Sequence, residues 1–496
     1  MPTSRIEKSP ATVLEDGPSE SELAPWQESL SRWSLLLCVL WVNFGIGWVW
    51  LVQASSEIQS YIFYGNITPV EFRLLNEIFL YVYIPIGPVG CYLIDKHFKL
   101  AIFISAATIS AGSVLSYFAG DSYDLALAAN ILMALCQGTI FPAAGFMANR
   151  YFPEKLVQVI VVLPLFMNIL GNGAAQWFPI FLMDDTHEDS VIHARFSTIH
   201  MMSMFACVPS LLLFIPFWLW PLKPRMSTKS DVKATEEYKI LLVEHQTQVA
   251  EEKNLNIGWW KGTILTVMTR MPLTNLIIGA AAEGMWSTWL TVANSEMINF
   301  GYTDLFTGGI NFALVMVGVI LSLCLSWNMN TPKKMDLGLK VTSLLVTLCW
   351  TAFTLFKVLY GGNIFMYQST VFTGCLLFYY FLMGTAYMSW IGLLFNSACV
   401  VCSPISEAIS TGNVLILNNG LGYGSQELIG HLGITGWWVI VGLHMVAFLI
   451  NMFWYETKPT IDVQHLELEM DNDSKVSNKE VLSIVGDVKR KLDRIA

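Results

Sequence analysis

Charged residues are scarce in this sequence: Asp, Glu, Lys and Arg make up 13% of its 496 residues. Hydrophobic residues make up 54% and the mean hydropathy is +0.52, which excludes an ordinary soluble globular protein. Apolar runs of about 20 residues, the length of a membrane-spanning helix, recur along the chain. We therefore predict an all-α membrane protein with twelve transmembrane helices, at residues 33–56, 75–94, 100–119, 125–149, 156–183, 196–220, 271–295, 304–328, 337–359, 366–395, 405–430 and 435–455.

The first 32 residues lack the apolar core of a signal peptide and carry six acidic residues. This composition is typical of a disordered cytosolic tail, so the first span is expected to direct insertion.

Basic residues are scarce on one side of the predicted topology. With both termini cytosolic, 25 of the 28 Lys and Arg residues fall in cytosolic segments, and only Arg73, Arg195 and Lys357 lie at outer ends or loops. The positive-inside rule therefore predicts cytosolic termini, and we expect the plasma membrane as the location.

The large outer loops lack cysteine, because all nine cysteines fall within or beside predicted spans. Disulfide bonds are therefore not expected. Cys399 and Cys402 form a C-x-x-C pair, but zinc would need a second pair or nearby histidines, so we interpret both as packing residues. The outer segments do hold one N-x-S/T acceptor at Asn66, which predicts a glycoprotein.

Catalytic signatures are missing as well. The sequence has no H-E-x-x-H and no G-x-S-x-G, and no Lys or Thr follows the glycines near Gly171 and Gly422 at Walker spacing. We therefore predict no enzyme activity, no cofactor and no metal. The glycines are expected to act either as hinges or in close helix packing.

A polar stretch divides the twelve spans into two sets of six. The expected parts are a disordered N-terminal tail (1–32), a six-helix bundle (33–220), a cytosolic linker (221–270), a second six-helix bundle (271–456) and a cytosolic C-terminal tail (457–496).

The turn after the second span reads Gly90-Cys-Tyr-Leu-Ile-Asp95-Lys96, which resembles the short cytosolic motif of the major facilitator superfamily. That superfamily binds substrate near mid-membrane between two bundles. Asp95 and Lys96 are expected to act in conformational gating, since a carboxylate beside a cation can clamp helices.

Polar and aromatic residues interrupt the first apolar run near its end. At positions i, i+3 and i+7, Trp50, Gln53 and Glu57 would share one helical face, while Trp48 would point elsewhere. Polar groups are costly in hydrocarbon, so this face is expected to line a wet cavity.

The seventh predicted span carries a matching face. Glu283 and Trp286 lie one turn apart, and Trp289 continues the same side. A quaternary ammonium group has no hydrogen-bond donor and binds over tryptophan rings, so two facing tryptophans would form a cage for an organic cation. Alternatively, Glu283 and Glu77 are proton carriers of a coupled transporter.

Three ordered stretches carry a family resemblance. The first runs from Trp50 through FYG (63–65) and VYIP (82–85) to LIDK (93–96); the second joins Gln137 to NRYFPEK (149–155); the third is SPISEAISTGNVLILNNG (403–420). They resemble the feline leukaemia virus subgroup C receptor family, a haem and choline transporter-related branch of the superfamily. The third stretch is similar to that family's P-x-x-E-x-x-S-x-G entry into span eleven.

The resemblance implies a transporter of choline, or in some members ethanolamine, with Trp50 and Trp286 around the ligand. The family's two site glutamines fall on Asn168, or alternatively on its neighbour Ile169, and on Asn419 here; asparagine shortens the reach of the amide by one methylene group. The resemblance adds Gln137 to the substrate site. It also adds Glu407, Ser410 and Gly412 to the expected gating residues.

Haem export is an alternative that the same resemblance implies. Haem iron needs a ligand such as His, Met, Cys or Tyr, and His187, His193 and His200 lie on the expected outer side. An uncharged aromatic site instead favours a small organic cation. A receptor or sensor that binds without transport is the other alternative. The expected partners are the small-molecule ligand and the lipid bilayer, with no nucleic acid, and we expect a monomer.

Overall fold

The computed structural model describes residues 25–53, 57–65, 67–183, 188–222, 259–299, 302–329, 331–360, 370–403 and 405–457, and every regular element within them is a helix. The first helix group comprises α1 (Pro25–Leu51), α2 (Glu57–Phe63), α3 (Pro69–Ala119), α4 (Tyr123–Ala134), α5 (Gln137–Ile140), α6 (Ala143–Tyr151), α7 (Glu154–Met183), α8 (Asp189–Cys207) and α9 (Pro209–Leu219). The second helix group comprises α11 (Trp259–Met268), α12 (Arg270–Asn299), α13 (Asp304–Asn328), α14 (Pro332–Tyr360), α16 (Thr370–Val401), α17 (Glu407–Leu432) and α18 (Ile434–Phe453).

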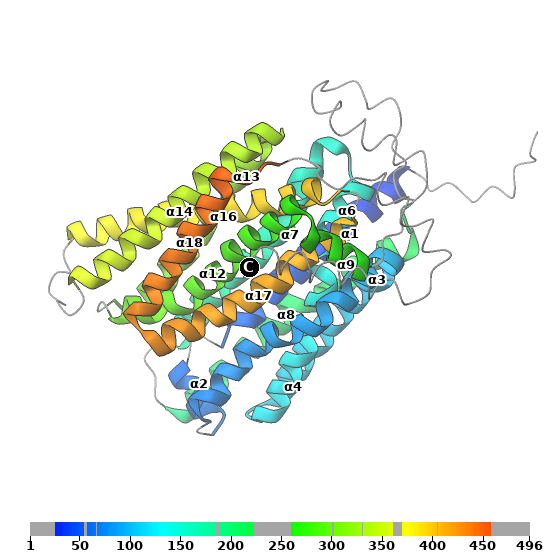
Figure 1. Cartoon of the computed structure of the whole chain (residues 1–496). Helices are drawn as coiled ribbons and strands as arrows, with labels where there is room; N and C mark the ends of the chain where they lie inside the picture. The colour runs from blue at the N-terminus through cyan, green and yellow to red at the C-terminus, as the bar shows by residue number, and fades with distance from the viewer. Residues whose placement is uncertain are drawn as a thin grey trace, which may run out of the picture.

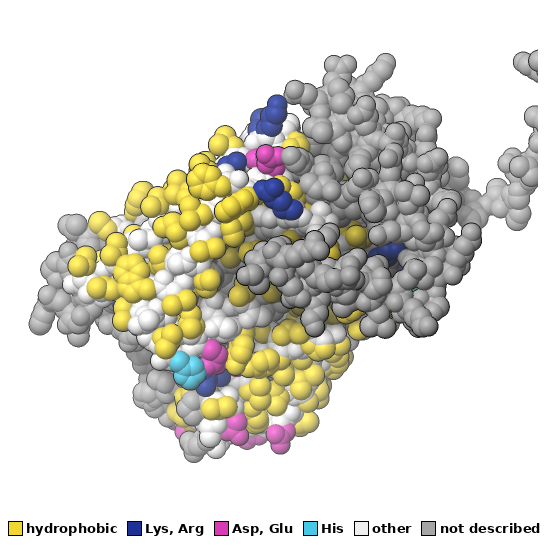
Figure 2. Space-filling model, in the orientation of Figure 1, with side chains coloured by type: hydrophobic (Ala, Val, Ile, Leu, Met, Phe, Trp, Pro, Cys, Tyr) yellow, Lys and Arg dark blue, Asp and Glu magenta, His cyan; other side chains and the backbone are white. Residues whose placement is uncertain are grey.

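The surface of these helices is apolar. Among the described residues, nine helical stretches are long and apolar enough to cross a membrane, and α11 with α12 forms a tenth that bends by 94°. Figure 2 shows hydrophobic side chains over most of the described part of one face, with charged side chains toward its upper and lower ends. Phe118, Phe181 and Phe453 are 75%, 68% and 72% exposed, which is unfavourable in water and favourable in lipid. The prediction of an all-α membrane protein is confirmed.

Helix α3 crosses the membrane region twice. Its backbone leaves helical geometry at His97, where φ is −138° and ψ is 52°. The amide of Asn130 in α4 donates to the carbonyl of Leu75 (2.9 Å), and Gly112 lies against Ala129 of the same helix. A straight helix would hold residues 75 and 112 about 55 Å apart, so the chain must turn back at His97.

Helix α17 coincides with the predicted span 405–430, although it is not among the apolar candidates. Five glycines and three asparagines lower its hydropathy. It packs against α12 in its own group and against α3 in the other. When the two crossings of α3 and the bent α11–α12 pair are included, each of the twelve predicted spans overlaps one or more described helices.

Two boundaries differ from the predicted ones at segment ends. Helix α1 begins at Pro25, so residues 25–32, which we expected in a disordered tail, are helical. The proline suits this position because the first helical turn needs no backbone donor there. Residues 259–268 of the expected linker form α11, which packs against α17.

The predicted fourth span is not one continuous helix. It divides into α4, α5 and α6, with breaks at Leu135–Cys136 and at Phe141–Pro142. A proline inside a helix removes a backbone hydrogen bond, which accounts for the second break. The breaks place the single turn of α5 deep in the protein, where all four of its residues are buried.

The two helix groups meet along α3–α17 and α7–α13. Figure 1 shows α13, α14, α16 and α18 at one side, α3, α4, α8 and α9 at the other, and α7, α12 and α17 between them. We define the linker side as the end where the chain leaves at Leu222 and resumes at Trp259. Near that side, Cys91 Sγ donates to the carbonyl of Ala408 (3.2 Å), and at the opposite end Arg73 lies 3.7 Å from Glu427. The groups therefore touch at both ends of their interface.

Candidate functional site

A cavity of about 530 Å³, including its open mouth, lies between the two groups. The lining residues are Ile46, Trp50, Phe79, Leu80, Gln137, Phe141, Asn168, Ile169, Asn172, Trp286, Ile391, Leu415, Asn418 and Asn419. None of these described lining residues is charged.

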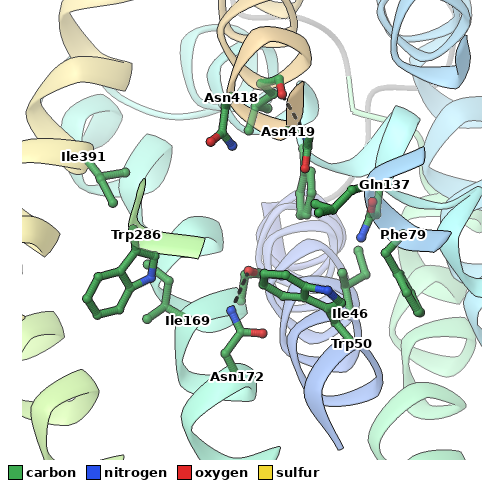
Figure 3. A pocket seen from close by; sticks show the side chains of 14 residues that line it. Ile46, Trp50, Phe79, Gln137, Ile169, Asn172, Trp286, Ile391, Asn418 and Asn419 are labelled. Atoms are coloured by element: carbon green, nitrogen blue, oxygen red, sulfur yellow. Dashed lines mark hydrogen bonds between the residues drawn. The ribbon is translucent and has the colours of Figure 1, made fainter. Parts of the chain in front are cut away.

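Two tryptophans line this cavity from opposite groups. Trp50 lies in the last turn of α1, and Trp286 comes from α12 across the interface (Figure 3). Trp286 is only 2% exposed, and its indole Nε1 has no hydrogen-bond partner among the described residues. The structure thus brings the two expected cage residues to one cavity, with a spare donor on one wall.

Carboxamides supply the polar part of the lining. They are Gln137, Asn168, Asn172, Asn418 and Asn419. Asn172 Nδ2 donates to Asn168 Oδ1 (3.4 Å), and Asn168 Nδ2 donates to the carbonyl of Asn43 (3.2 Å). The Oδ1 atoms of Asn172 and Asn418 have no hydrogen-bond partner in the described part of the chain. A ligand that donates hydrogen bonds would satisfy them.

Close contact between α1 and α7 sets the geometry of the first wall. A Cβ at Gly47 would lie 1.9 Å from the carbonyl oxygen of Asn168, and a Cβ at Gly171 would lie 2.2 Å from that of Phe44. Only glycine permits such an approach of two helix backbones. Of the two roles expected for Gly171, the observed one is close packing. The contact holds Trp50 beside the amides of α7.

The break in the fourth span also shapes the cavity. Gln137 opens α5 and Phe141 follows its end, and both line the cavity. Gln137 is 5% exposed, so its amide is presented in the protein interior. Interrupted helices at the midpoint of a transporter commonly carry the ligand site.

Gln53 lies away from the cavity, and this corrects the expected helical face. Helix α1 ends at Leu51, so the stripe from Trp50 to Gln53 and Glu57 is not continuous. Gln53 is buried and its Nε2 donates to the hydroxyl of Tyr64 (3.0 Å). The side chain of Glu57 lies outside the described residues.

Trp289, which we expected beside Trp286 in the binding site, does not line the cavity. Trp289 is fully buried within the second group, where its ring packs against those of Trp350 (5.6 Å), Phe353 (5.0 Å) and Trp437 (6.5 Å). It therefore belongs to the helix core and not to the cavity lining. The side chain of Glu283 lies outside the described ones.

Charged gating candidates gather near the linker side of the α3–α17 interface. Asp95 and Lys96 are 3.5 Å apart. Glu407 is close enough to interact electrostatically with both Asp95 and Arg150. Arg150 attracts the Glu407 carboxylate and Asp95 repels it, so charges from both groups lie together at this end of the interface.

The other two gating candidates lie one to two turns further along α17. A Cβ at Gly412 would lie 2.2 Å from Cys91 Sγ, so glycine permits the contact with α3. The hydroxyl of Ser410 donates to the carbonyl of Ser406 within its own helix (3.1 Å). Gly412 is therefore part of the interface, whereas the hydrogen bond of Ser410 does not cross it.

The histidines considered for haem do not line the cavity. His193 is exposed on α8 with its ring 4.9 Å from that of Phe63, and His200 is buried against Phe63 and Phe196. His187 lies outside the described residues, as does the expected glycosylation site at Asn66.

Among the lining residues that sequence reasoning missed, four are aromatic or carry an amide: Phe79, Phe141, Asn172 and Asn418. The two asparagines carried a usable signal. Asn172 lies one helical turn after Asn168, and Asn418 is adjacent to Asn419. An amide inside an apolar span is costly unless it has a partner, so each marks an interior face. The two phenylalanines carried no such signal.

Comparison with known proteins identifies the family. The model of the Major Facilitator Superfamily matches residues 33–423. The chain belongs to this superfamily. No relative among curated protein sequences matches it significantly.

Solved superfamily structures share the fold. The E. coli fucose:proton symporter FucP is 14% identical, with 88% of this chain and 99% of that chain covered at a TM-score of 0.55. The proton:xylose symporter XylE, solved with 6-bromo-6-deoxy-D-glucose, is 13% identical, with coverages of 87% and 97% and a TM-score of 0.60. Superfamily membership and this fold make the protein a multi-pass membrane transporter of a small molecule.

Proposed function

We propose that this transporter carries choline or a related small organic cation, such as ethanolamine. The observation that supports this most strongly is the cavity with Trp50 on one wall, Trp286 on the other and no charged described lining residue. A quaternary ammonium group requires no acceptor, and each aromatic face binds it with about 0.5–2 kcal/mol. The free carboxamide oxygens of Asn172 and Asn418 suit the hydroxyl group of choline.

Transport would proceed by alternating access of two six-helix bundles, residues 33–220 and 271–456. In the proposed cycle, the cluster of Asp95, Arg150 and Glu407 separates when the cavity opens on the linker side, and the pair of Arg73 and Glu427 separates when it opens on the other. We place the linker side in the cytosol because the basic residues concentrate there, and we propose the plasma membrane as the location.

A neutral polyol is the second candidate substrate. Five carboxamides line one cavity, and two of their oxygens and the indole donor of Trp286 have no hydrogen-bond partner among the described residues, which suits a ligand with several hydroxyl groups. Tryptophan faces also pack on sugar rings. FucP and XylE are symporters of the sugars fucose and xylose, so these two sugars are the natural probes. Haem export has no comparable support from the cavity.

Counterflow in proteoliposomes separates these candidates. Vesicles loaded with unlabelled choline are diluted into labelled choline, and the internal label is followed over time. We expect saturable accumulation that tetramethylammonium and ethanolamine inhibit and that fucose, xylose and haem do not. If labelled fucose or xylose accumulates in vesicles loaded with the same sugar, and labelled choline does not accumulate, the substrate is a polyol and not choline. Saturable choline binding without counterflow would instead indicate a receptor.

Trp50→Ala is the matching variant test. It removes one aromatic face, and a loss of about 1–2 kcal/mol lowers choline affinity roughly 5- to 30-fold. Trp438→Ala is the control, because Trp438 is 40% exposed on α18 and lies away from the cavity. Equal choline affinity in the two variants would remove the cage from the mechanism.

Glu283→Gln tests the proton-carrier and counter-ion alternatives. If the aromatic faces hold the cation, the substitution changes choline affinity less than about threefold. A severe loss of affinity would assign Glu283 as the counter-ion. Loss of pH-driven uptake with counterflow intact would assign it as the proton carrier.

A further inference from the structure

Behind the Trp286 wall, three buried side chains form a continuous hydrogen-bonded chain. Trp350 Nε1 of α14 donates to the hydroxyl of Tyr387 in α16 (2.6 Å), which lies 2.5 Å from His444 Nε2 in α18. His444 Nδ1 lies 3.1 Å from the carbonyl oxygen of Ile440. Trp350, Tyr387 and His444 each have no exposed surface. Three helices of the second group therefore meet at one polar point.

The protons in this chain have one consistent arrangement. The carbonyl of Ile440 can only accept, so His444 carries its proton on Nδ1, and Nε2 of the neutral ring is an acceptor. The Tyr387 hydroxyl then donates to Nε2 and accepts from Trp350. Every polar group in the chain is satisfied in this arrangement, and a fully satisfied buried network is rigid.

The network reaches the cavity through the ring of Tyr387. The rings of Tyr387 and Trp286 are 5.3 Å apart at an interplanar angle of 45°. Trp286 Nε1 has no hydrogen-bond partner among the described residues, so packing and not a hydrogen bond to the indole positions the Trp286 ring. Two hydrogen bonds on the Tyr387 hydroxyl fix the ring on which Trp286 rests, beside the cavity seen in Figure 3.

A proton-carrying role for His444 fits this environment poorly. Trp350, Tyr387 and Trp390 surround its ring, and within the described residues no carboxylate hydrogen-bonds to it. An imidazolium ion would be buried there without a counter-ion, which is costly. A neutral ring that orients Tyr387 meets no such cost.

We propose that Tyr387, His444 and Trp350 are positioning residues that hold Trp286 at the angle at which its face meets the ligand. They touch no ligand themselves and act through one aromatic contact. This inference deepens the proposed function, because it names the support of the same cavity wall. Its consequence is that a substitution remote from the cavity changes substrate affinity with little effect on turnover.

Tyr387→Phe tests the inference because it keeps the ring and deletes the hydroxyl. We expect KM for choline counterflow to rise about three- to tenfold with kcat within about twofold. His444→Leu, which removes the acceptor, should reproduce this effect, and His444→Gln, which retains one, should largely restore KM. Tyr379→Phe is the control, since that hydroxyl on the same helix has no hydrogen-bond partner among the described residues. An unchanged KM in Tyr387→Phe overturns the proposal.

A double-substitution cycle separates positioning from a general structural role. In a Trp286→Ala background, Tyr387→Phe should raise KM no further, because the residue that it positions is gone. A merely structural role predicts that the two effects multiply. Multiplied effects would therefore overturn the positioning role even if each single variant were impaired.

A readout without ligand keeps the two proposals distinguishable. In protein labelled with fluorotryptophan, the Trp286 resonance is assigned by its loss in Trp286→Phe. We expect this fluorine resonance to shift or broaden in Tyr387→Phe and to stay in place in Tyr379→Phe. If it shifts while the parent protein binds no choline, the positioning role stands and the proposed substrate fails. If choline is transported and the resonance stays in place, the positioning role fails alone.

Discussion

The contact between α1 and α7 yields the most quantitative test of how the cavity is built. Alanine at position 47 would put its methyl carbon 1.9 Å from the backbone carbonyl oxygen of Asn168 and 2.9 Å from the backbone nitrogen of Asn172. An ordinary carbon–oxygen contact is about 3.3 Å, so the two helices must separate locally by about 1.4 Å. Overpacking of this kind costs about 1–3 kcal/mol. Gly47→Ala is therefore expected to lower thermal stability.

The same substitution should weaken ligand binding. Asn168 and Asn172 both line the cavity, and Trp50 follows Gly47 by less than one turn of α1. A separation of more than 1 Å lengthens the hydrogen bond from either amide to the ligand beyond its useful range of about 2.7–3.2 Å. Loss of one such bond, about 1.4 kcal/mol, raises Kd for choline about tenfold.

The control for Gly47→Ala is Gly424→Ala. A Cβ at Gly424 would meet no atom within 4 Å, and alanine is more favourable than glycine inside a helix by about 0.5–1 kcal/mol. The assay is thermal unfolding of the purified protein in detergent, with and without choline. We expect a lower melting temperature and a smaller choline-induced stabilisation for Gly47→Ala, and an equal or higher melting temperature for Gly424→Ala. Indistinguishable variants would refute the reasoning.

Two further substitutions test Gln53, which lies away from the cavity, and Gly412, which is an expected gating residue. Gln53→Leu removes the hydrogen bond to Tyr64 and should lower the free energy of unfolding by about 1 kcal/mol while KM stays unchanged; a raised KM would return Gln53 to the binding site. Gly412→Ala places a Cβ 2.2 Å from Cys91 Sγ and should force the α3–α17 interface apart, so that a water-soluble maleimide labels Cys91 and counterflow is lost. In a second variant, Cys91→Ala should remove the clash and restore counterflow in Gly412→Ala; continued inactivity would argue against this contact.

The number and type of spanning helices followed from the sequence because one physical quantity, the thickness of the hydrocarbon layer, sets the length of every apolar run. Hydropathy does not report where a helix begins or bends. Composition predicts a tail and a linker for the helical residues 25–32 and 259–268, because a helix at a membrane boundary carries polar residues like those of a loop. The breaks beside Cys136 and Pro142 depend on packing partners that a single apolar run does not identify.

Part of the cavity could be predicted because polar groups in an apolar span must face the interior. This rule and the family resemblance together indicated Trp50 and Trp286, and the resemblance alone added Asn168, Asn419 and Gln137; all five line the cavity. The spacing rule failed for Gln53, because i and i+3 share a face only while the helix continues and α1 ends at Leu51. It failed for Trp289 because a bulky ring at helical spacing serves the core as well as a cavity.

Each tryptophan wall is built within its own helix group, which has a consequence for the transport cycle. Trp50 is held through the glycine contact of α1 with α7, and Trp286 through the ring of Tyr387. Neither support crosses the interface, so each wall can keep its shape when the groups separate. A ligand that touches both walls then stabilises the closed arrangement over either open one, whereas a ligand on one wall stabilises no arrangement in particular. Trp50→Ala should therefore abolish choline-induced closure even where residual binding to Trp286 persists.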